Sequence, residues 1–409
     1  MSLASLESVL EMTAAQIKPE QPHYLSLFEE NGITPKRALP HWIIRPVQKE
    51  IEATPELSEF AKRHSARRIA KLLVHRLFDG IEPKQLIADI LDLSLSNEWP
   101  KCTYVGLYGG GISGEIQLDE FVIAMPADKS PRSAAREFVF GIDRDGREIV
   151  EFFHPPRWRP NIALLIFEKT KNSEAADETD STQPQVIYEK IQRSIQALTL
   201  ASGHPFVSSW QTSWIMHPAI PYEGFGGLAA SGSFDQIPLG GRSKDTTAVD
   251  PKLAREVYLQ LAEMPPAIER QIRLATDRLK RSRVHHPSAD TVIDLGIAGE
   301  IILLHNPGST GELSYQFAVN GACLLGTDET NRKKTFETLR ALYGARSKAV
   351  HEGTIKPAII PQLPDFDLLC SRIIRCILAQ QQFPDWNQLV LGDKQATQTD
   401  AAGLGGMER

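Results

Sequence analysis

The candidate chemistry of this chain begins with an arginine and a histidine that stand five residues apart, Arg346 and His351 in the segment RSKAVH. Histidine is suited to moving a proton near neutral pH, because its unperturbed pKa is about 6.5. Arginine presents a fixed fork of N–H donors that suits a phosphate anion. Together they raise the question of a site that cuts nucleic acid. The spacing alone decides nothing, because RSRVHH (281–286) repeats it.

Two other kinds of site are not indicated by the sequence. The segment GGGISG (109–114) fits the pattern G-x-G-x-x-G, but a strand-like stretch follows it where a dinucleotide site needs a helix N-terminus. We therefore expect a hairpin turn there and no cofactor. The eleven histidines are scattered, without H-x-x-x-H or H-E-x-x-H spacing, so we also expect no metal ion.

The elements that must position these residues divide the chain. Its 409 residues exceed one ordinary core, so we expect two domains. The first hundred residues are mainly helical in pattern, with residues 58–80 at helical spacing and Gly80 as a C-cap. Strand-like stretches and one further helix follow. The patterns predict an α+β sensor or regulatory domain over residues 1–223 and a Gly/Ser-rich linker over residues 224–250.

Residues 251–390 are almost wholly helical in pattern, which predicts an all-α bundle, and residues 391–409 are expected to form a flexible tail. A basic helix (267–283) precedes an apolar helix (288–305), which is expected at the centre of the bundle. A later helix, with Thr327 or Asp328 as its N-cap, carries RSKAVH. Residues 251–390 hold 17 Lys and Arg against 15 Asp and Glu, whereas the rest of the chain has a charge of about −8. A polyanion is therefore expected to meet the C-terminal third.

The helices from residue 265 to 385 resemble the Apea-like branch of the HEPN superfamily, whose members are small helical bundles with an R-x(4–6)-H motif. The family pattern has a D…I-A-L-E helix, then Y-x-F…A…L-L, then R…L…L-Y-x-x-R-S-K-x-V-H-G. No such neighbourhood surrounds RSRVHH, so the resemblance singles out RSKAVH. The residues that carry it are, in order, Asp294, Ala298, Glu300, Tyr315, Phe317, Ala322, Leu324, Leu325, Arg332, Leu339, Tyr343, Arg346, Ser347, Val350 and His351.

The resemblance implies a metal-independent endoribonuclease that cleaves RNA by attack of its own 2′-hydroxyl. His351 would move the proton, and Arg346 would stabilise the anionic phosphorane. Such families usually work as homodimers in which two Arg–His pairs meet in one cleft. Five residues along a helix correspond to about 140° of rotation, which suits side chains that flank a shared cleft. We expect a toxin or antiviral defence effector.

Further residues are expected around this pair, with Glu300 and Ser347 in the catalytic group. Glu300 is an acid in an apolar helix and needs a partner, for which Arg346 is the candidate. Ser347 would donate to a phosphate oxygen or cap the turn, and Tyr315 would stack on a base or belong to the core. Four basic residues of the first helix would either guide the RNA backbone or form a solvated face: Arg278, Lys280, Arg281 and Arg283.

One departure from the family pattern keeps a second function open. Where the family often has an arginine in its second helix, this chain has Asn320-Gly321. Asn320 is grouped with the RNA-binding residues, but the departure also allows a non-catalytic module that dimerises and binds RNA or a protein. A third hypothesis, weaker because no catalytic pattern is recognisable there, makes the N-terminal domain an enzyme. That domain is otherwise expected to bind a regulatory protein or ligand.

The sequence also favours the cytoplasm. No apolar run approaches the roughly 18 residues that span a bilayer, and the N-terminus lacks the basic start of a secretion signal. The four cysteines have no C-x-x-C pairing and are expected as reduced thiols.

Overall fold

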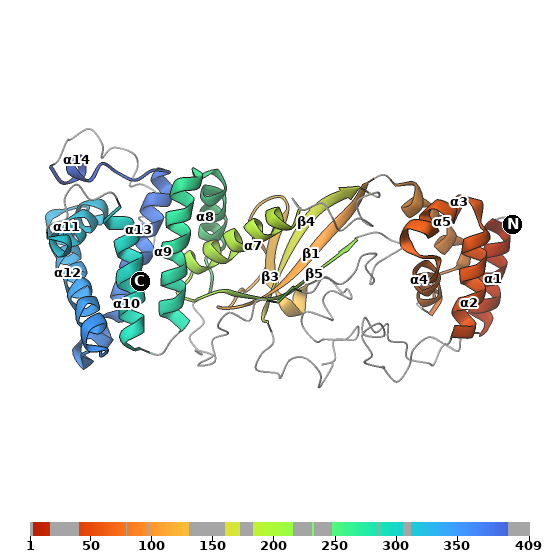
Figure 1. Ribbon diagram of the computed structural model, residues 1–409, viewed down its shortest axis with the longest axis horizontal. Coiled ribbons are helices and arrows are strands. Elements are labelled where there is room, and N and C mark those ends of the chain that lie inside the picture. Colours follow the sequence, from red (N-terminus) through yellow and green to blue (C-terminus); the bar gives the residue numbers. More distant parts are fainter. Residues whose placement is uncertain are drawn as a thin grey trace. The chain divides into compact units, whose positions relative to one another are not determined.

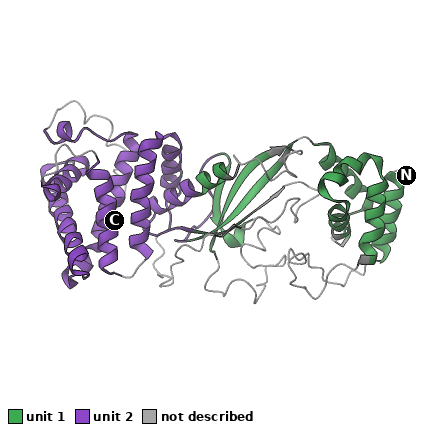
Figure 2. Ribbon diagram, in the orientation of Figure 1, with its two compact units in different colours: residues 1–108, 120–191, 208–234 green, residues 109–119, 192–207, 235–409 purple. Residues whose placement is uncertain are grey.

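The computed structural model describes most of the chain. The described ranges are residues 3–16, 41–78, 80–96, 98–130, 160–171, 183–215, 231–232, 248–284, 287–305 and 312–391. They fall into two compact units (Figure 2). The first unit comprises residues 1–108, 120–191 and 208–234, and the second comprises residues 109–119, 192–207 and 235–409.

The first unit begins with five helices: α1 (Leu3–Gln16), α2 (His41–Ala53), α3 (Pro55–His64), α4 (Ala66–Phe78) and α5 (Pro83–Leu95). Each is amphipathic, and the apolar faces share one core that includes Leu10, Val47, Phe60, Leu73 and Ile90. Gly80 has a φ of 78°, as a C-cap glycine requires.

The helical pattern of residues 58–80 does not form one helix. Ser65 separates α3 from α4 with φ 65° and ψ 116°, a conformation that a residue with a Cβ atom rarely adopts. The break lets both helices bury apolar residues in one core, Leu57 and Phe60 from α3 and Ile69 and Leu73 from α4. Burial on both sides of the turn compensates for the strain at Ser65.

A sheet follows with strand order β2-β3-β4-β1-β5-β6. Long strands β1 (Glu98–Tyr108) and β4 (Ile162–Lys171) pair antiparallel, and β3 (Val122–Pro126) pairs antiparallel with β4. The short 3-10 helix η2 (Ala127–Lys129) follows β3, and helix α7 (Gln183–Leu200) precedes β5 (Val207–Ile215). These elements confirm the predicted α+β N-terminal region.

The predicted linker (224–250) lies mostly outside the described residues. Within it, Ser231–Gly232 forms β6, which pairs with β5. The two-residue strand β2 (Ile116–Gln117) follows the glycine-rich segment 109–114, so a strand stands where a dinucleotide site would need a helix. The expected hairpin turn is wrong, because β2 neighbours β3 and not β1 in the sheet.

The second unit contains the predicted all-α region (Figure 1). Helix α10 (Ala289–Leu303) contacts α9 (Pro266–Val284), α11 (Leu313–Leu325), α12 (Glu329–Glu352) and α13 (Leu363–Gln380), which confirms its predicted central place. Helix α8 (Pro251–Glu263) packs against α13. The 3-10 helix η4 (Pro357–Gln362) leads into α13, and α14 (Trp386–Leu391) closes the described chain.

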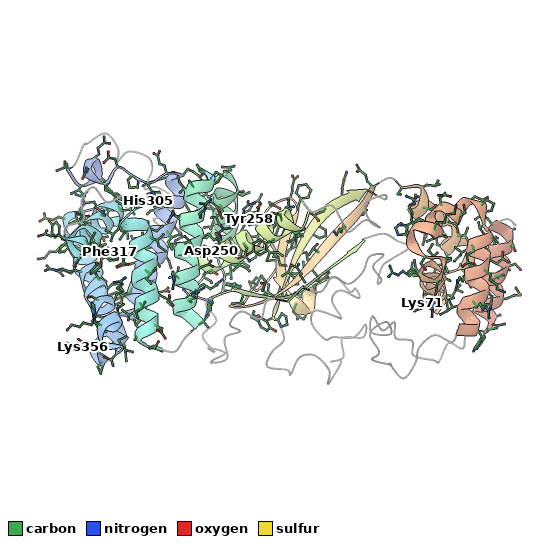
Figure 3. All side chains as sticks on the ribbon, in the orientation of Figure 1. Lys71, Asp250, Tyr258, His305, Phe317 and Lys356 are labelled. Atoms are coloured by element: carbon green, nitrogen blue, oxygen red, sulfur yellow. The ribbon has the colours of Figure 1, made fainter. Side chains whose placement is uncertain are left out.

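Close packing in this bundle depends on small residues. A Cβ atom at Gly299 of α10 would lie 2.8 Å from ring atoms of Phe317 on α11. Phe317, labelled in Figure 3, is fully buried and packs against Tyr343 of α12 with ring centroids 5.5 Å apart. Glycine therefore lets α10 and the aromatic layer of α11 and α12 approach one another.

None of the helices that the structure describes is both long and apolar enough to cross a membrane. The predicted tail, apart from its first residue, lies outside the described residues.

Candidate phosphate-binding site on the C-terminal bundle

Helix α12 holds three of the four predicted catalytic residues. It starts at Asp328, whose Oδ1 accepts a hydrogen bond from the Asn331 amide at 2.9 Å. It ends at Gly353, which has a φ of 67° and whose N–H donates to the Ala349 carbonyl at 2.9 Å. The predicted catalytic residues on this helix are Arg346, Ser347 and His351, all within its last two turns.

The predicted pairing of Glu300 with Arg346 is confirmed. Arg346 Nη2 donates to Glu300 Oε2 at 3.1 Å, and the side chains are 28% and 21% exposed respectively. A Cβ atom at Gly296, one turn before Glu300, would lie 2.5 Å from Arg346 Cγ, so the glycine gives the arginine stem its place on α10. The pair is half-buried.

The electrostatics of this pair are balanced. Burial raises the pKa of the Glu300 carboxyl above its ordinary range, and the positive charge of Arg346 opposes that rise. The Nε atom of Arg346 is buried and has no hydrogen-bond partner among the described residues. Glu300 thus orients Arg346 through Nη2.

His351 lies in the last turn of α12 and is exposed. It stands five residues after Arg346, which corresponds to about 140° around the helix and about 7.5 Å along it. Arg346 is directed towards α10, whereas His351 is open to solvent. Ser347 is intermediate in exposure. One copy of the chain therefore presents the arginine and the histidine in different directions.

Two lysines near the end of α12 belong to the same surface, although they were not among the predicted site residues. Lys348 and Lys356 are both exposed. The pKa of Lys356 is lowered, first because its ammonium group lies within hydrogen-bonding reach of Lys348 and next because the two charges repel, while Glu352 acts in the opposite direction. Figure 3 labels Lys356 beyond the C-terminal end of α12. In the sequence, the basic residues on either side of His351 in RSKAVHEGTIK would have indicated this surface.

The predicted basic set of α9 is divided by the structure. Arg278 Nη1 donates to Asp294 Oδ1 of α10 at 3.0 Å, and this arginine is 38% exposed. Lys280 pairs with Asp277 of its own helix at 3.2 Å. Arg281 is exposed. These three residues form a partly neutralised face of α9.

Arg283 has a different environment from the other three. Its side chain is 6% exposed and makes a two-pronged contact with Asp367 of α13, from Nε to Oδ1 at 2.8 Å and from Nη2 to Oδ2 at 2.9 Å. Its Nη1 donates to the carbonyls of Thr199 at 2.6 Å and Ser202 at 3.1 Å, at the end of α7. Arg283 holds α7, α9 and α13 together, and an RNA backbone cannot use a guanidinium that is occupied in this way.

The two predicted RNA contacts on α11 also differ. Tyr315 is 55% exposed and meets Phe336 edge to face, with centroids 5.8 Å apart, so it lies at the surface rather than in the core. Asn320 is 8% exposed, and its Nδ2 donates to the Leu303 carbonyl at 2.8 Å. Asn320 therefore caps the end of α10 inside the bundle and is remote from solvent.

In the part of the chain that the structure describes, no three His, Cys, Asp or Glu side chains are grouped so that they could hold a metal ion. Among the described residues the four cysteines, Cys102, Cys323, Cys370 and Cys376, are free thiols.

Comparison with models of known protein families, with curated proteins and with solved structures gives no match for this chain.

Proposed function

We propose that the protein is a metal-independent endoribonuclease of HEPN type. The observation that supports this most is the half-buried Arg346, which Glu300 holds at 3.1 Å on the helix that also carries His351. A fixed guanidinium suits the developing charge of a phosphorane better than a mobile surface arginine does, because it needs no reorganisation.

In the proposed reaction, His351 accepts the proton of the 2′-hydroxyl, and the 2′-oxygen attacks the adjacent phosphorus. Arg346 donates to the non-bridging oxygens of the anionic intermediate, and Ser347 donates to one of them. The bond to the 5′-oxygen breaks, and the leaving oxygen takes up a proton from water, while His351 returns its proton to the solvent. The products are a 2′,3′-cyclic phosphate and a 5′-hydroxyl, with no net oxidation and no requirement for a metal ion.

The different directions of Arg346 and His351 favour a site assembled from two copies of the chain. In a homodimer, the arginine of one copy and the histidine of the other would face one phosphate. The exposed Tyr315 is available to stack on a base, and the exposed Arg281, Lys348 and Lys356 are available to flanking phosphates. Arg283 and Asn320 are left out of this proposal because they are buried and engaged in the fold.

The cleavage test uses purified protein, labelled RNA and a chelator. Wild type should release fragments that end in 2′,3′-cyclic phosphate, whereas Arg346→Ala and His351→Ala should each lower the rate by about a hundredfold or more. Arg340→Ala is the matched control, because Arg340 is an exposed arginine of the same helix. Unchanged cleavage in the first two variants would exclude this site.

A mixing experiment tests the shared site. Each variant alone should be inactive, and a mixture of Arg346→Ala with His351→Ala should recover activity, because a mixed dimer contains one intact pair. A mixture that stays inactive while mixed dimers form would contradict a site shared between copies.

The buried Asn320 favours a second candidate function, a non-catalytic module that dimerises and binds RNA or a protein. At this position the family often has an arginine, and here the Asn320 side chain donates its hydrogen bond to the backbone carbonyl of Leu303. RNA binding without cleavage, and unaffected by His351→Ala, would favour this candidate.

The cellular role that we propose is that of a toxin or antiviral defence effector in the cytoplasm, with the N-terminal region as its regulatory part. Induced expression should arrest growth and fragment cellular RNA, and His351→Ala should relieve both effects. Growth arrest that persists in the variant without RNA damage would contradict a nuclease toxin.

A further inference from the structure

A second basic surface lies in the first unit, away from the candidate nuclease residues in sequence. Residues 60–78 contain six Lys and Arg and no Asp or Glu, in a chain whose formal net charge is −6. They cover the end of α3, the turn at Ser65 and all of α4. Their charge is therefore a local feature of two helices and opposes that of the chain.

The fold places these charges outward. On α4, Ile69, Ala70, Leu73 and Leu77 are buried in the five-helix core, which fixes the orientation of the helix. The remaining face carries basic residues: Arg67 and Arg68 are exposed, and Lys71 is partly exposed. Figure 3 labels Lys71 on α4. Together with the exposed Arg63 at the end of α3, these residues form what we call the α3–α4 basic surface.

Ion pairs within the fold neutralise Lys62 and Arg76, but not the two arginines at the start of α4. Lys62 pairs with Glu59 at 2.6 Å, and Arg76 is 14% exposed and faces Asp89 at 4.0 Å. No ion pair at Arg67 or Arg68 is seen among the described residues. These two arginines also occupy the first turn of α4, where the helix dipole disfavours positive charge by about 0.3–1 kcal/mol for each. The arrangement costs stability, so a structural role does not explain it.

We propose that the α3–α4 basic surface binds the phosphodiester backbone of a nucleic acid strand. Arginines at positions i, i+1 and a lysine at i+4 lie within about one turn of helix, so they can contact consecutive phosphates. A membrane surface fits less well, because an interfacial helix needs large apolar residues beside its basic ones. The large apolar residues of α3 and α4 whose exposure is described are not among the exposed ones. This surface does not depend on the proposed cleavage chemistry.

The test measures binding of the full-length protein to a labelled single-stranded DNA by fluorescence anisotropy. DNA lacks the 2′-hydroxyl, so the proposed cleavage cannot act on it. The double variant Arg67→Glu/Arg68→Glu should weaken binding by about tenfold or more, and should reduce the slope of log affinity against log salt by about 1.4, the value for two phosphate contacts on a single strand. Both side chains are exposed, and circular dichroism checks that the variant is folded.

The control is Lys252→Glu/Arg255→Glu on α8, which makes the same change of net charge at exposed positions. It should change the affinity by less than about twofold if the location of the charge matters. Equal weakening by both double variants, or no weakening by the α4 variant, would overturn the proposal. The proposal would also be overturned if the α4 variant lost binding to phosphatidylserine vesicles and kept its affinity for DNA.

Discussion

Replacing Glu300 by glutamine should separate the two roles of its carboxylate, in folding and in holding Arg346. Unit charges 3.1 Å apart attract by about 5 kcal/mol at an effective dielectric constant of about 20, which is an upper limit for this half-buried pair. Burial nevertheless raises the pKa of Glu300 above its ordinary value, so desolvation cancels the attraction. The charge of Glu300 therefore adds little or nothing to the stability of the fold.

The sign of the pH dependence follows from that raised pKa. The folded state binds the proton of Glu300 more tightly than the unfolded state does. The contribution of this group to stability is thus complete below its ordinary pKa of 4.5 and is lost as the pH rises through the folded value. Glu300→Gln removes this loss, so the free energy of unfolding at neutral pH should stay within about 1 kcal/mol of wild type or rise.

The matched variant is Arg346→Ala, which leaves an ionised, half-buried Glu300 without its partner. It should lose about 2 kcal/mol at neutral pH, and the loss should shrink as the pH is lowered and Glu300 becomes protonated. Hydrogen exchange of the α10 and α12 amides between about pH 5 and about pH 8 reports the local free energies.

Cleavage of RNA should respond differently from stability. Glu300→Gln keeps a hydrogen-bond acceptor but loses the charge that fixes the guanidinium, so the rate should fall by about tenfold while the fold is intact. The reasoning would be refuted if Glu300→Gln lost more than about 2 kcal/mol at neutral pH and kept the pH dependence of wild type.

Four further outcomes are expected. Asn320→Leu should lower the free energy of unfolding by about 2 kcal/mol, since a buried carbonyl of α10 loses its donor; a wild-type urea midpoint would contradict this. Arg283→Lys should cost about 3 kcal/mol in the same assay, because an ammonium group cannot replace the two-pronged contact with α13. Ser65→Gly should raise the melting temperature by relieving about 1 kcal/mol of backbone strain, and a lower value would show that the turn is unstrained. Lys348→Ala with Lys356→Ala should weaken RNA binding by about tenfold in anisotropy titrations, and unchanged affinity would place the RNA elsewhere.

The local sequence pattern was sufficient to predict the helices of the bundle and one contact of the candidate site. Helix α10 is apolar on nearly every side, and such a helix is stable only when others surround it. Glu300 interrupts that apolar surface, so a cationic partner on a neighbouring helix was required, and Arg346 supplies it. In both cases the sequence contained a group that is unstable by itself, an apolar helix surface or a buried carboxylate, and the fold had to supply its partner.

Such local patterns could not predict which residues pair over long distances in the sequence. Arg283 looks like its basic neighbours in sequence, yet it pairs with Asp367, 84 residues later, and with carbonyls at the end of α7. Periodicity does not reveal which charge meets a distant helix end. The break at Ser65 was missed for a related reason, because helical spacing continues across it and only burial in the core compensates for its strained φ.

The second unit consists of three separate stretches of the chain, so its parts are synthesised at different times. Its earliest segment starts at Gly109, and the Asp367 carboxylate that receives Arg283 is made 84 residues after that arginine. At translation rates of 5–20 residues per second, roughly 4 to 17 s separate the synthesis of Arg283 from that of Asp367. Throughout that time Arg283 lacks its counter-charge, and α12 has not yet been enclosed by α13. The bundle that carries Arg346 and His351 is therefore completed only after α13 has been synthesised, which delays any activity of this surface until then.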